Sequence, residues 1–229
     1  MPVAERLPRL EPVGPQPARP RAMVVLAHGG RSQSTESGER RRLTYWRMLP
    51  FAQVLARTDG LAVAMVRYRH RGWNGSSRDA ARDVARLLTS DLPTALVGHS
   101  MGGRAVLHCA GAPRVRAVAA LAPWLDGTDP VEQLAGRSVL IAHGDRERMT
   151  DPRQSLAYAV RAKRVTDRVA RFEMHGDGHA MLRHAADWHD LVRRFVLGEL
   201  GFEPEDTAIT NAMRQPIPGG LEVPWGVTR

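Results

Sequence analysis

The chain has 229 residues, of which 43% are hydrophobic and one is a cysteine, and its formal net charge is +9. This length favours a single α/β domain with a sizeable core, and a lone cysteine excludes an internal disulfide. No apolar stretch reaches the roughly 18 residues of a membrane-spanning helix, and the first residues lack the apolar core of a secretory signal. We therefore expect a soluble, cytoplasmic protein with no membrane partner.

The positive charge is a feature shared with nucleic-acid-binding proteins, which neutralise phosphates with clustered cations. Here the basic residues are scattered along the chain, and the only run of three is Arg40–Arg42. A solvated helix end explains that run. We expect no nucleic-acid partner, and the oligomeric state stays open.

Apolar runs and helical patterns alternate along the chain between an irregular start and an irregular end. Residues 1–21 are rich in proline and arginine and are expected to be irregular. The elements expected after them are strand 23–27, helix 43–57 with a kink or restart at Pro50, strand 61–66, helix 78–88, strand 94–97, helix 101–110, strand 115–121, short helix 131–134, strand 139–142, helix 152–163, strand 169–174 and helix 182–197. The sequence thus divides into an N-terminal segment (1–21), a domain (22–200) and a C-terminal tail (201–229).

Alternation of short apolar strands with helices predicts a mainly parallel sheet covered on both faces, a three-layer α/β sandwich. Ligands bind such sheets at the carboxyl ends of the strands. The loops that follow the strands are therefore the place to look for chemistry.

The most informative loop is Gly98-His99-Ser100-Met101-Gly102-Gly103, which lies between the strand at 94–97 and the helix at 101–110. Glycines flank Ser100 where a sharp strand-to-helix turn strains the backbone and brings neighbouring chain close. Such an elbow leaves the serine hydroxyl exposed at the edge of the sheet. Ser100 is therefore predicted to be a nucleophile.

A serine nucleophile needs a base, and His179 is the best placed of the nine histidines because it follows the last predicted strand. His99 is expected to point away from Ser100 and to fix the backbone or line the pocket. His28 and His143, which each precede a glycine at a strand end, are expected to hold loops together through hydrogen bonds. His175 and His179 have no third ligand at a suitable spacing, so no metal is predicted.

The base in turn needs an acid. The loop after the strand at 139–142 offers three carboxylates, namely Asp145, Glu147 and Asp151. Asp126 and Asp129, which follow the preceding strand, are further alternatives. The residue pattern alone does not choose among them.

Four motifs together resemble the α/β-hydrolase superfamily over about residues 23–198. They are the elbow, His28-Gly29-Gly30, the His143-Gly144 loop and the late Gly178-His179. The resemblance implies an acid three residues after Gly144, which is Glu147, with Asp145 as the alternative. Relatives usually carry aspartate there, so this chain differs by one methylene.

The resemblance also implies an oxyanion hole formed by the backbone N–H of Met101 and a second donor after the first buried strand, Gly30, with Arg31 as its neighbour. Only about 17 residues separate the strands at 115–121 and 139–142, too few for a large lid. A minimal fold without a cap domain is expected. In length and motif order the chain resembles the small esterases related to dienelactone hydrolases, although those typically use cysteine where this chain has Ser100.

These expectations add up to a serine hydrolase that cleaves a small carboxylic ester or thioester and needs no cofactor. Arg31, Trp73 and Trp124 are candidates for substrate binding, and Arg69, Arg71 and Arg104 are expected to join Arg31 in a positive rim. Acyl transfer or perhydrolysis on the same scaffold is an alternative, as is a binding protein that retains the fold without catalysis. Cys109, on the helix after the elbow, is expected to be buried as a small apolar residue.

Overall fold

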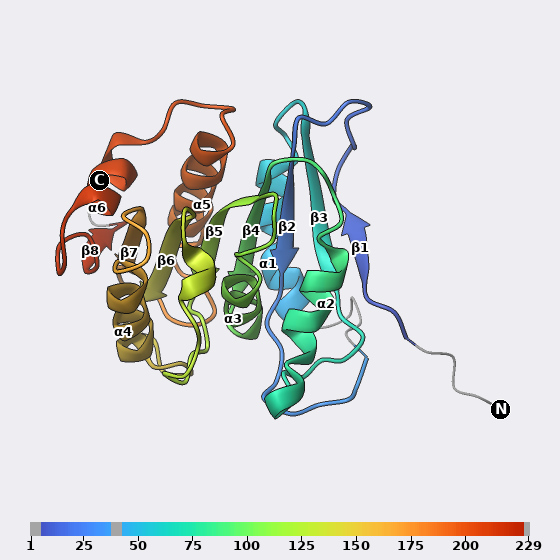
Figure 1. Cartoon of the computed structure of the whole chain (residues 1–229), viewed down its shortest axis with the longest axis horizontal. Coiled ribbons are helices and arrows are strands. Elements are labelled where there is room, and N and C mark those ends of the chain that lie inside the picture. The colour runs from blue at the N-terminus through green and yellow to red at the C-terminus, as the bar shows by residue number, and fades with distance from the viewer. Residues whose placement is uncertain (1–5, 38–42, 227–229) are drawn as a thin grey trace.

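The strands of the computed structural model, which describes residues 6–37 and 43–226, form one sheet in the order β1-β3-β2-β4-β5-β6-β7-β8 (Figure 1). The strands are β1 (Arg9–Pro12), β2 (Ala22–Ala27), β3 (Leu61–Arg67), β4 (Thr94–His99), β5 (Val115–Leu121), β6 (Ser138–Gly144), β7 (Val169–Met174) and β8 (Val223–Trp225). All neighbouring pairs are parallel except β1 and β3, which are antiparallel. The expected mainly parallel sheet is confirmed.

Helices cover both faces of the sheet and complete a three-layer sandwich (Figure 1). They are α1 (Leu43–Leu55), α2 (Asp79–Leu87), α3 (Met101–His108), α4 (Pro152–Ala162), α5 (Ala185–Glu199) and α6 (Thr207–Arg214), with short 3₁₀ turns η1 (Gly75–Ser77) and η2 (Glu132–Leu134). Side chains of α1, α5 and α6 pack into one apolar core and those of α2, α3 and α4 into a second.

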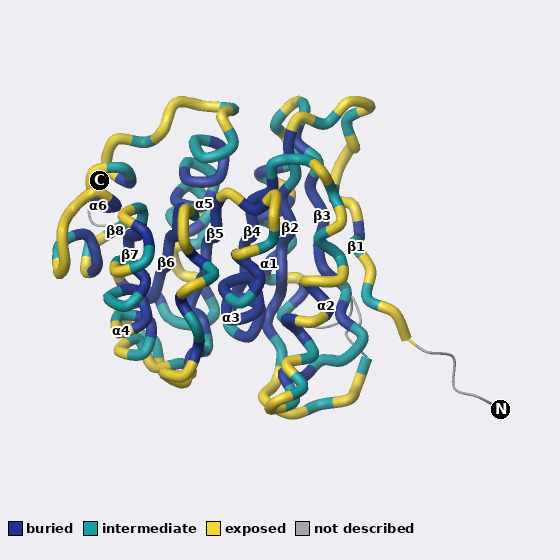
Figure 2. Tube along the Cα trace, viewed as in Figure 1, coloured by how far each residue is buried: buried dark blue, intermediate teal, exposed yellow. Residues whose placement is uncertain are grey.

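The sheet separates these two cores because successive side chains of a strand point to opposite faces. In β2, Val24 and Leu26 belong to the core under α1 and α5, whereas Val25 and Ala27 belong to the core under α2 and α3. Every residue of β4 and β6 is buried, as the dark tube of the central strands shows (Figure 2). Burial on both faces explains why these strands appear in the sequence as continuous apolar runs.

The two ends of the chain differ from the expectation of irregular structure. β1 lies within residues 1–21 as an antiparallel edge strand, and β8, within the tail, extends the other edge. The tail also contains α6, and Leu221, which lies between α6 and β8, is completely buried. Edge strands are short and tolerate proline, so neither strand has the apolar pattern by which a central strand is recognised.

Smaller differences concern the helices. Pro50 lies inside the continuous helix α1, without a restart. The stretch expected as a short helix at 131–134 is the 3₁₀ turn η2, and α5 begins at Ala185, three residues later than expected. The arginine triplet at 40–42 falls in 38–42, outside the described residues.

The link between β5 and β6 consists of residues 122–137 and contains only η2 as regular structure. Across the described parts of the chain there is accordingly no cap domain over the carboxyl edge of the sheet, as expected. None of the helices described is long and apolar enough to cross a membrane.

Candidate active site

Ser100 lies at the sharp turn between β4 and α3 and has φ 56° and ψ −120°. A non-glycine residue in this left-handed region is strained, and such strain is typical of functional turns. A Cβ on Gly98 would overlap the backbone of Gly102, and a Cβ on Gly102 would overlap the carbonyl of Ala27. The glycines around Ser100 are therefore required by close backbone approach.

His179 and Glu147, which follow β7 and β6, are joined by a hydrogen bond. His179 Nδ1 donates to Oε2 of Glu147 at 2.9 Å. The other carboxylate oxygen, Oε1, accepts backbone N–H groups from Arg148, Met149 and Thr150 at 2.8, 2.7 and 3.3 Å. These bonds fix the carboxylate, and with it the plane and tautomer of the imidazole.

The side chain of Glu147 is fully buried, yet it stays charged. Burial raises the pKa of the carboxyl group, but the hydrogen bond from His179 and the N–H groups of Met149 and Thr150 outweigh it and lower the pKa to about 2. Glu147 therefore offers His179 a permanently ionised partner near neutral pH.

The other carboxylates considered for this position have different partners. Asp145 accepts hydrogen bonds from the backbone N–H of Gly176 at 2.9 Å and pairs with Nδ1 of His175 at 3.1 Å. Asp151 caps the N-terminus of α4 by accepting from the N–H of Arg153. Neither carboxylate contacts His179.

His99 connects the loop of Ser100 with the loop of His179. Its Nε2–H donates to the backbone carbonyl of His179 at 2.9 Å, and the two imidazole rings lie 4.7 Å apart. Burial holds the pKa of His99 well below its usual value, so the ring is neutral. Within the described residues, Oγ of Ser100 and Nε2 of His179 make no hydrogen bond, either with each other or with another group.

Two backbone N–H groups near Ser100 are also free. Met101 is the first residue of α3, so its N–H lies outside the helical hydrogen-bond pattern. Gly30 packs against the side chain of Met101, and its N–H has no partner among the residues described. The N–H of Arg31, by contrast, donates to the carbonyl of Arg71 at 3.0 Å.

His28 and His143 both bond to the loops that follow their strands, as the sequence predicts. Nδ1 of His28 donates to the carbonyl of Gly29 at 2.7 Å, and Nε2 of His143 lies 3.0 Å from Oγ1 of Thr150. Because the C=O and N–H of a peptide point in opposite directions, the bond to Gly29 directs the N–H of Gly30 away from His28. His28 thereby orients the loop beside Ser100.

The structure overturns the expectation that Arg69, Arg71 and Arg104 form a positive rim. Arg69 pairs with Asp79 and Asp83, and Arg71 pairs with Glu36. Of the four arginines considered, Arg31 alone is exposed without a side-chain ion pair in the described chain.

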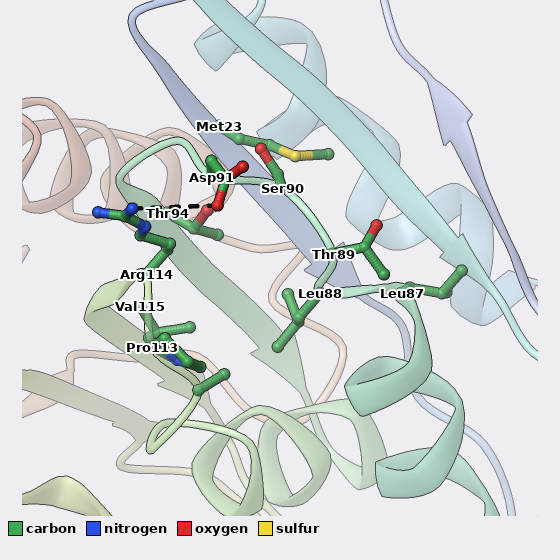
Figure 3. A pocket seen from close by; sticks show the side chains of 11 residues that line it. Met23, Leu87, Leu88, Thr89, Ser90, Asp91, Thr94, Pro113, Arg114 and Val115 are labelled. Carbon is green, nitrogen blue, oxygen red and sulfur yellow. Dashed lines mark ion pairs between the residues drawn. The ribbon is translucent and has the colours of Figure 1, made fainter.

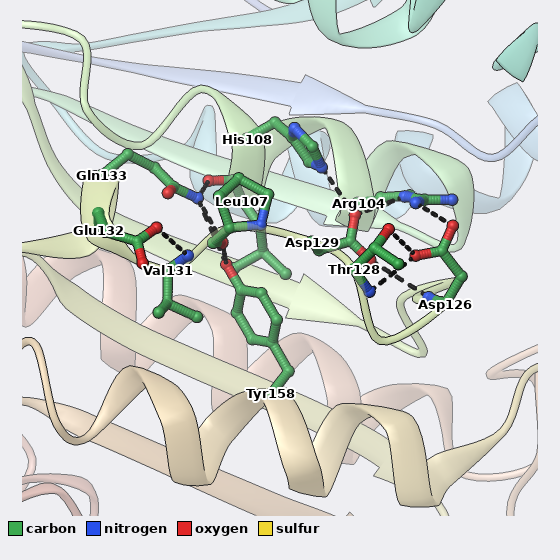
Figure 4. A network of polar contacts seen from close by, with 11 residues as sticks. Arg104, Leu107, His108, Asp126, Thr128, Asp129, Val131, Glu132, Gln133 and Tyr158 are labelled. Carbon is green, nitrogen blue, oxygen red and sulfur yellow. Dashed lines mark hydrogen bonds and ion pairs between the residues drawn. The ribbon is translucent and has the colours of Figure 1, made fainter. Parts of the chain in front are cut away.

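Arg104 is buried in a polar network that the sequence analysis did not predict (Figure 4). It donates to Asp126 and, at 2.6 Å, to Asp129, which also accepts from His108 at 2.7 Å. Its guanidinium carbon lies 4.4 Å from the ring centre of Trp73 and 4.9 Å from that of Trp124. The sequence does carry a signal for this network, namely an arginine four residues after Ser100 and two aspartates after the next strand.

Of the two tryptophans, Trp124 contacts Ser100, whereas Trp73 is buried and its ring centre lies 6.5 Å from that of Trp124. Trp124 donates its backbone N–H to the carbonyl of Ser100 at 3.1 Å.

Cys109 is buried as expected, and burial raises the pKa of its thiol to about 12, which makes it unreactive. In the described parts of the chain, no group of three His, Cys, Asp or Glu side chains could hold a metal ion.

With this geometry established, the chain can be compared with known proteins. A family model described as the alpha/beta hydrolase family matches residues 24–228, nearly the whole chain. The chain therefore belongs to the alpha/beta hydrolase family. No protein among the curated sequences matches it.

Solved structures with the same fold share little sequence with this chain. Est1E from Butyrivibrio proteoclasticus, solved with ferulic acid bound, has a TM-score of 0.62 and 17% identity over 85% of this chain and 96% of its own. A serine hydrolase without a lid from Xanthomonas campestris has a TM-score of 0.56 and 19% identity over 90% and 100% of the two chains. The propionate-bound esterase Est2 from Thermogutta terrifontis has a TM-score of 0.60 and 18% identity over 87% and 92%. The family supports hydrolase activity for this chain, and the solved structures show that its fold is shared.

Proposed function

We propose that this protein is a serine esterase that hydrolyses a small carboxylic ester or thioester through an acyl-enzyme, with Ser100, His179 and Glu147 as its triad. The observation that carries the proposal is the hydrogen bond from His179 Nδ1 to the buried Glu147 carboxylate at 2.9 Å, in a loop that His99, the neighbour of the strained Ser100, contacts. It leaves Nε2 of His179 as the proton acceptor for Ser100.

In the acylation half-reaction, Oγ of Ser100 attacks the ester carbonyl carbon while Nε2 of His179 takes the hydroxyl proton. The tetrahedral intermediate then breaks its bond to the alcohol oxygen, which leaves with the proton from His179. In deacylation a water molecule gives a proton to His179 and attacks the acyl carbonyl carbon. The intermediate then breaks its bond to Oγ of Ser100, which takes the proton back from His179, and the acid is released. Glu147 stabilises the imidazolium that forms in both halves.

The backbone N–H groups of Met101 and Gly30 would bind the oxyanion of each tetrahedral intermediate. Both are free and both lie next to Ser100. A donor of this kind lowers the barrier by about 3 kcal/mol. The hydrogen bond of His28 to the carbonyl of Gly29 fixes the direction of one of the two donors before substrate arrives.

The short link between β5 and β6 leaves the proposed site open, which favours small water-soluble substrates over long-chain lipids. Without a cap, activity is expected to show no activation at lipid interfaces. We assign the enzyme to the cytoplasm and expect no nucleic-acid partner, since the single cysteine and the dispersed arginines give no reason for another assignment.

Replacing the nucleophile tests the proposal. Ser100→Ala removes the attacking oxygen, so kcat for p-nitrophenyl acetate should fall by about 10⁴-fold. Ser90→Ala, at the opposite edge of the sheet, is the matched control and should keep the rate of the unchanged protein. Equal activity of Ser100→Ala and the unchanged protein would refute the assignment.

A further inference from the structure

A pocket of about 280 Å³ is lined by Arg104 of α3 and by residues of the loops that follow β2, β3 and β5. Arg104 and Trp124 both line it, and each donates its backbone N–H to the carbonyl of Ser100 at 3.1 Å. The pocket therefore adjoins the turn that carries Ser100. A larger hollow of about 420 Å³, at the amino ends of β2, β4 and β5, has no such connection (Figure 3).

The pocket and the proposed base lie on opposite faces of the sheet. Trp73 and Trp124 pack with the core under α2 and α3. Met181, in the loop of His179, packs with the core under α1 and α5. Because the leaving alcohol takes its proton from His179, it must depart on that side. The acyl group, attached to the other side of the carbonyl carbon, is directed into the pocket.

Three polar side chains that line the pocket are unused. Within the described chain, the side chains of Ser32, Gln33 and Ser76 have no hydrogen-bond partner, although all three are exposed at the pocket. They offer hydroxyl and amide groups that both donate and accept. A group with hydroxyls of its own is the natural complement to such a lining.

The same lining does not suit a hydrocarbon chain or a charged group. The guanidinium of Arg104 lies over the rings of both Trp73 and Trp124, so these faces are already covered. The charge of Arg104 is balanced in turn by two aspartates. Arg78, the other arginine of the lining, has no ion pair in the described chain but is exposed to solvent, which screens its charge. We therefore expect neither apolar burial nor ion pairing to dominate binding.

We propose that this pocket binds an uncharged, hydroxyl-bearing acyl group, so that the preferred substrates are esters of small hydroxy acids. Gln33 and Ser76 hydrogen-bond to the hydroxyl and determine the preference. The inference rests on the proposed esterase function, because it assigns the acyl side of the same site.

The test compares two esters that differ by one hydroxyl group. Hydrolysis of methyl 3-hydroxybutyrate and methyl butyrate is followed by acid release, and each kcat/KM is divided by the rate constant for hydroxide-catalysed hydrolysis of that ester. The corrected ratio should favour the hydroxy ester by about tenfold, the effect of one or two added hydrogen bonds. In the double variant Gln33→Leu/Ser76→Ala the ratio should fall to about one, whereas Ser90→Ala should keep it.

The outcomes separate the two proposals. If methyl butyrate is hydrolysed and the corrected ratio is near one, or is unaltered in the double variant, the pocket assignment is wrong and the esterase function stands. If neither ester is hydrolysed, the esterase function fails. In that case tryptophan fluorescence of Ser100→Ala, titrated with both esters, still tests the pocket. Tighter binding of the hydroxy ester supports the assignment, and equal binding overturns it.

Discussion

At the scale of single residues, the choice of glutamate over aspartate at position 147 is explained by its loop. Oε1 of Glu147 accepts three successive backbone N–H groups, which leaves Oε2 for His179. The extra methylene is thus accommodated within the turn. The position could be predicted only through the family resemblance, because the loop offers three carboxylates and residue type does not distinguish them.

Two parallel substitutions test which carboxylate serves His179. Glu147→Gln keeps the shape but loses the charge that stabilises the imidazolium, so kcat should fall by about 10³- to 10⁴-fold. Asp145→Asn changes the contact with His175 and Gly176 and should alter kcat by less than about fivefold. Both values of kcat are measured with p-nitrophenyl acetate as the substrate. A larger loss in Asp145→Asn than in Glu147→Gln would reverse the assignment.

The lowered pKa of Glu147 also predicts how stability depends on pH. The pKa of the carboxyl is about 2 in the folded protein against 4.5 for an unperturbed glutamate. Its ionisation therefore stabilises the fold at pH above 4.5, and this contribution disappears as the pH falls toward 2. It amounts to at most about 3 kcal/mol.

Urea unfolding of the unchanged protein and of Glu147→Gln at pH 6, 4 and 3 measures this contribution. All other ionisable groups are the same in the two proteins, so the difference between them isolates the carboxyl group of Glu147. The difference in unfolding free energy should shrink steadily toward low pH. A difference that stays constant over this range would show that the carboxylate is not stabilised in the folded state.

At the scale of elements, the elbow depends on Gly102, where the backbones of α3, β4 and the end of β2 meet. A Cβ at this position would overlap the carbonyls of Ala27 and His28, neither of which can move without displacing β2. Gly102→Ala should therefore destabilise the protein by more than about 3 kcal/mol and abolish esterase activity. Gly136→Ala, whose φ is +69° with open space around it, should cost only about 1 kcal/mol and preserve activity. Thermal unfolding distinguishes the two, and equal losses would contradict this account of the elbow.

The central elements could be predicted from the sequence because burial on both faces produces unbroken apolar runs. β1 and β8 could not, since both contain proline and lie at edges where apolar patterning is weak. The role of Arg104 was also missed. Its environment is set by Asp126 and Asp129, which lie in the loop after β5, and local pattern does not reveal that contact.

At the scale of the whole molecule, the sheet brings distant segments to a single edge. The loops after β2, β4, β6 and β7 supply Gly30, Ser100, Glu147 and His179. The order of these motifs was predictable, because parallel strands deliver their carboxyl ends to the same side. Their mutual contacts were not, since they depend on loop conformations such as the turn that places Oε2 of Glu147 against His179.

The net charge of +9 has little to do with this edge. Many arginines are held in ion pairs inside the molecule, among them Arg69 with Asp83, Arg104 with Asp129 and Arg168 with Glu199. Paired cations contribute little to attraction of an anionic partner at physiological salt. The charge therefore reflects an arginine-rich composition better than a phosphate-binding surface.

Labelling with a fluorophosphonate, followed by peptide mass spectrometry, tests the central claim most directly, because such probes react with a serine only when a base and an oxyanion hole activate it. We predict one adduct per chain, located on Ser100, absent in Ser100→Ala and strongly slowed in His179→Ala. An adduct on another serine, or no adduct on the folded protein, would contradict the assignment of Ser100 as an activated nucleophile.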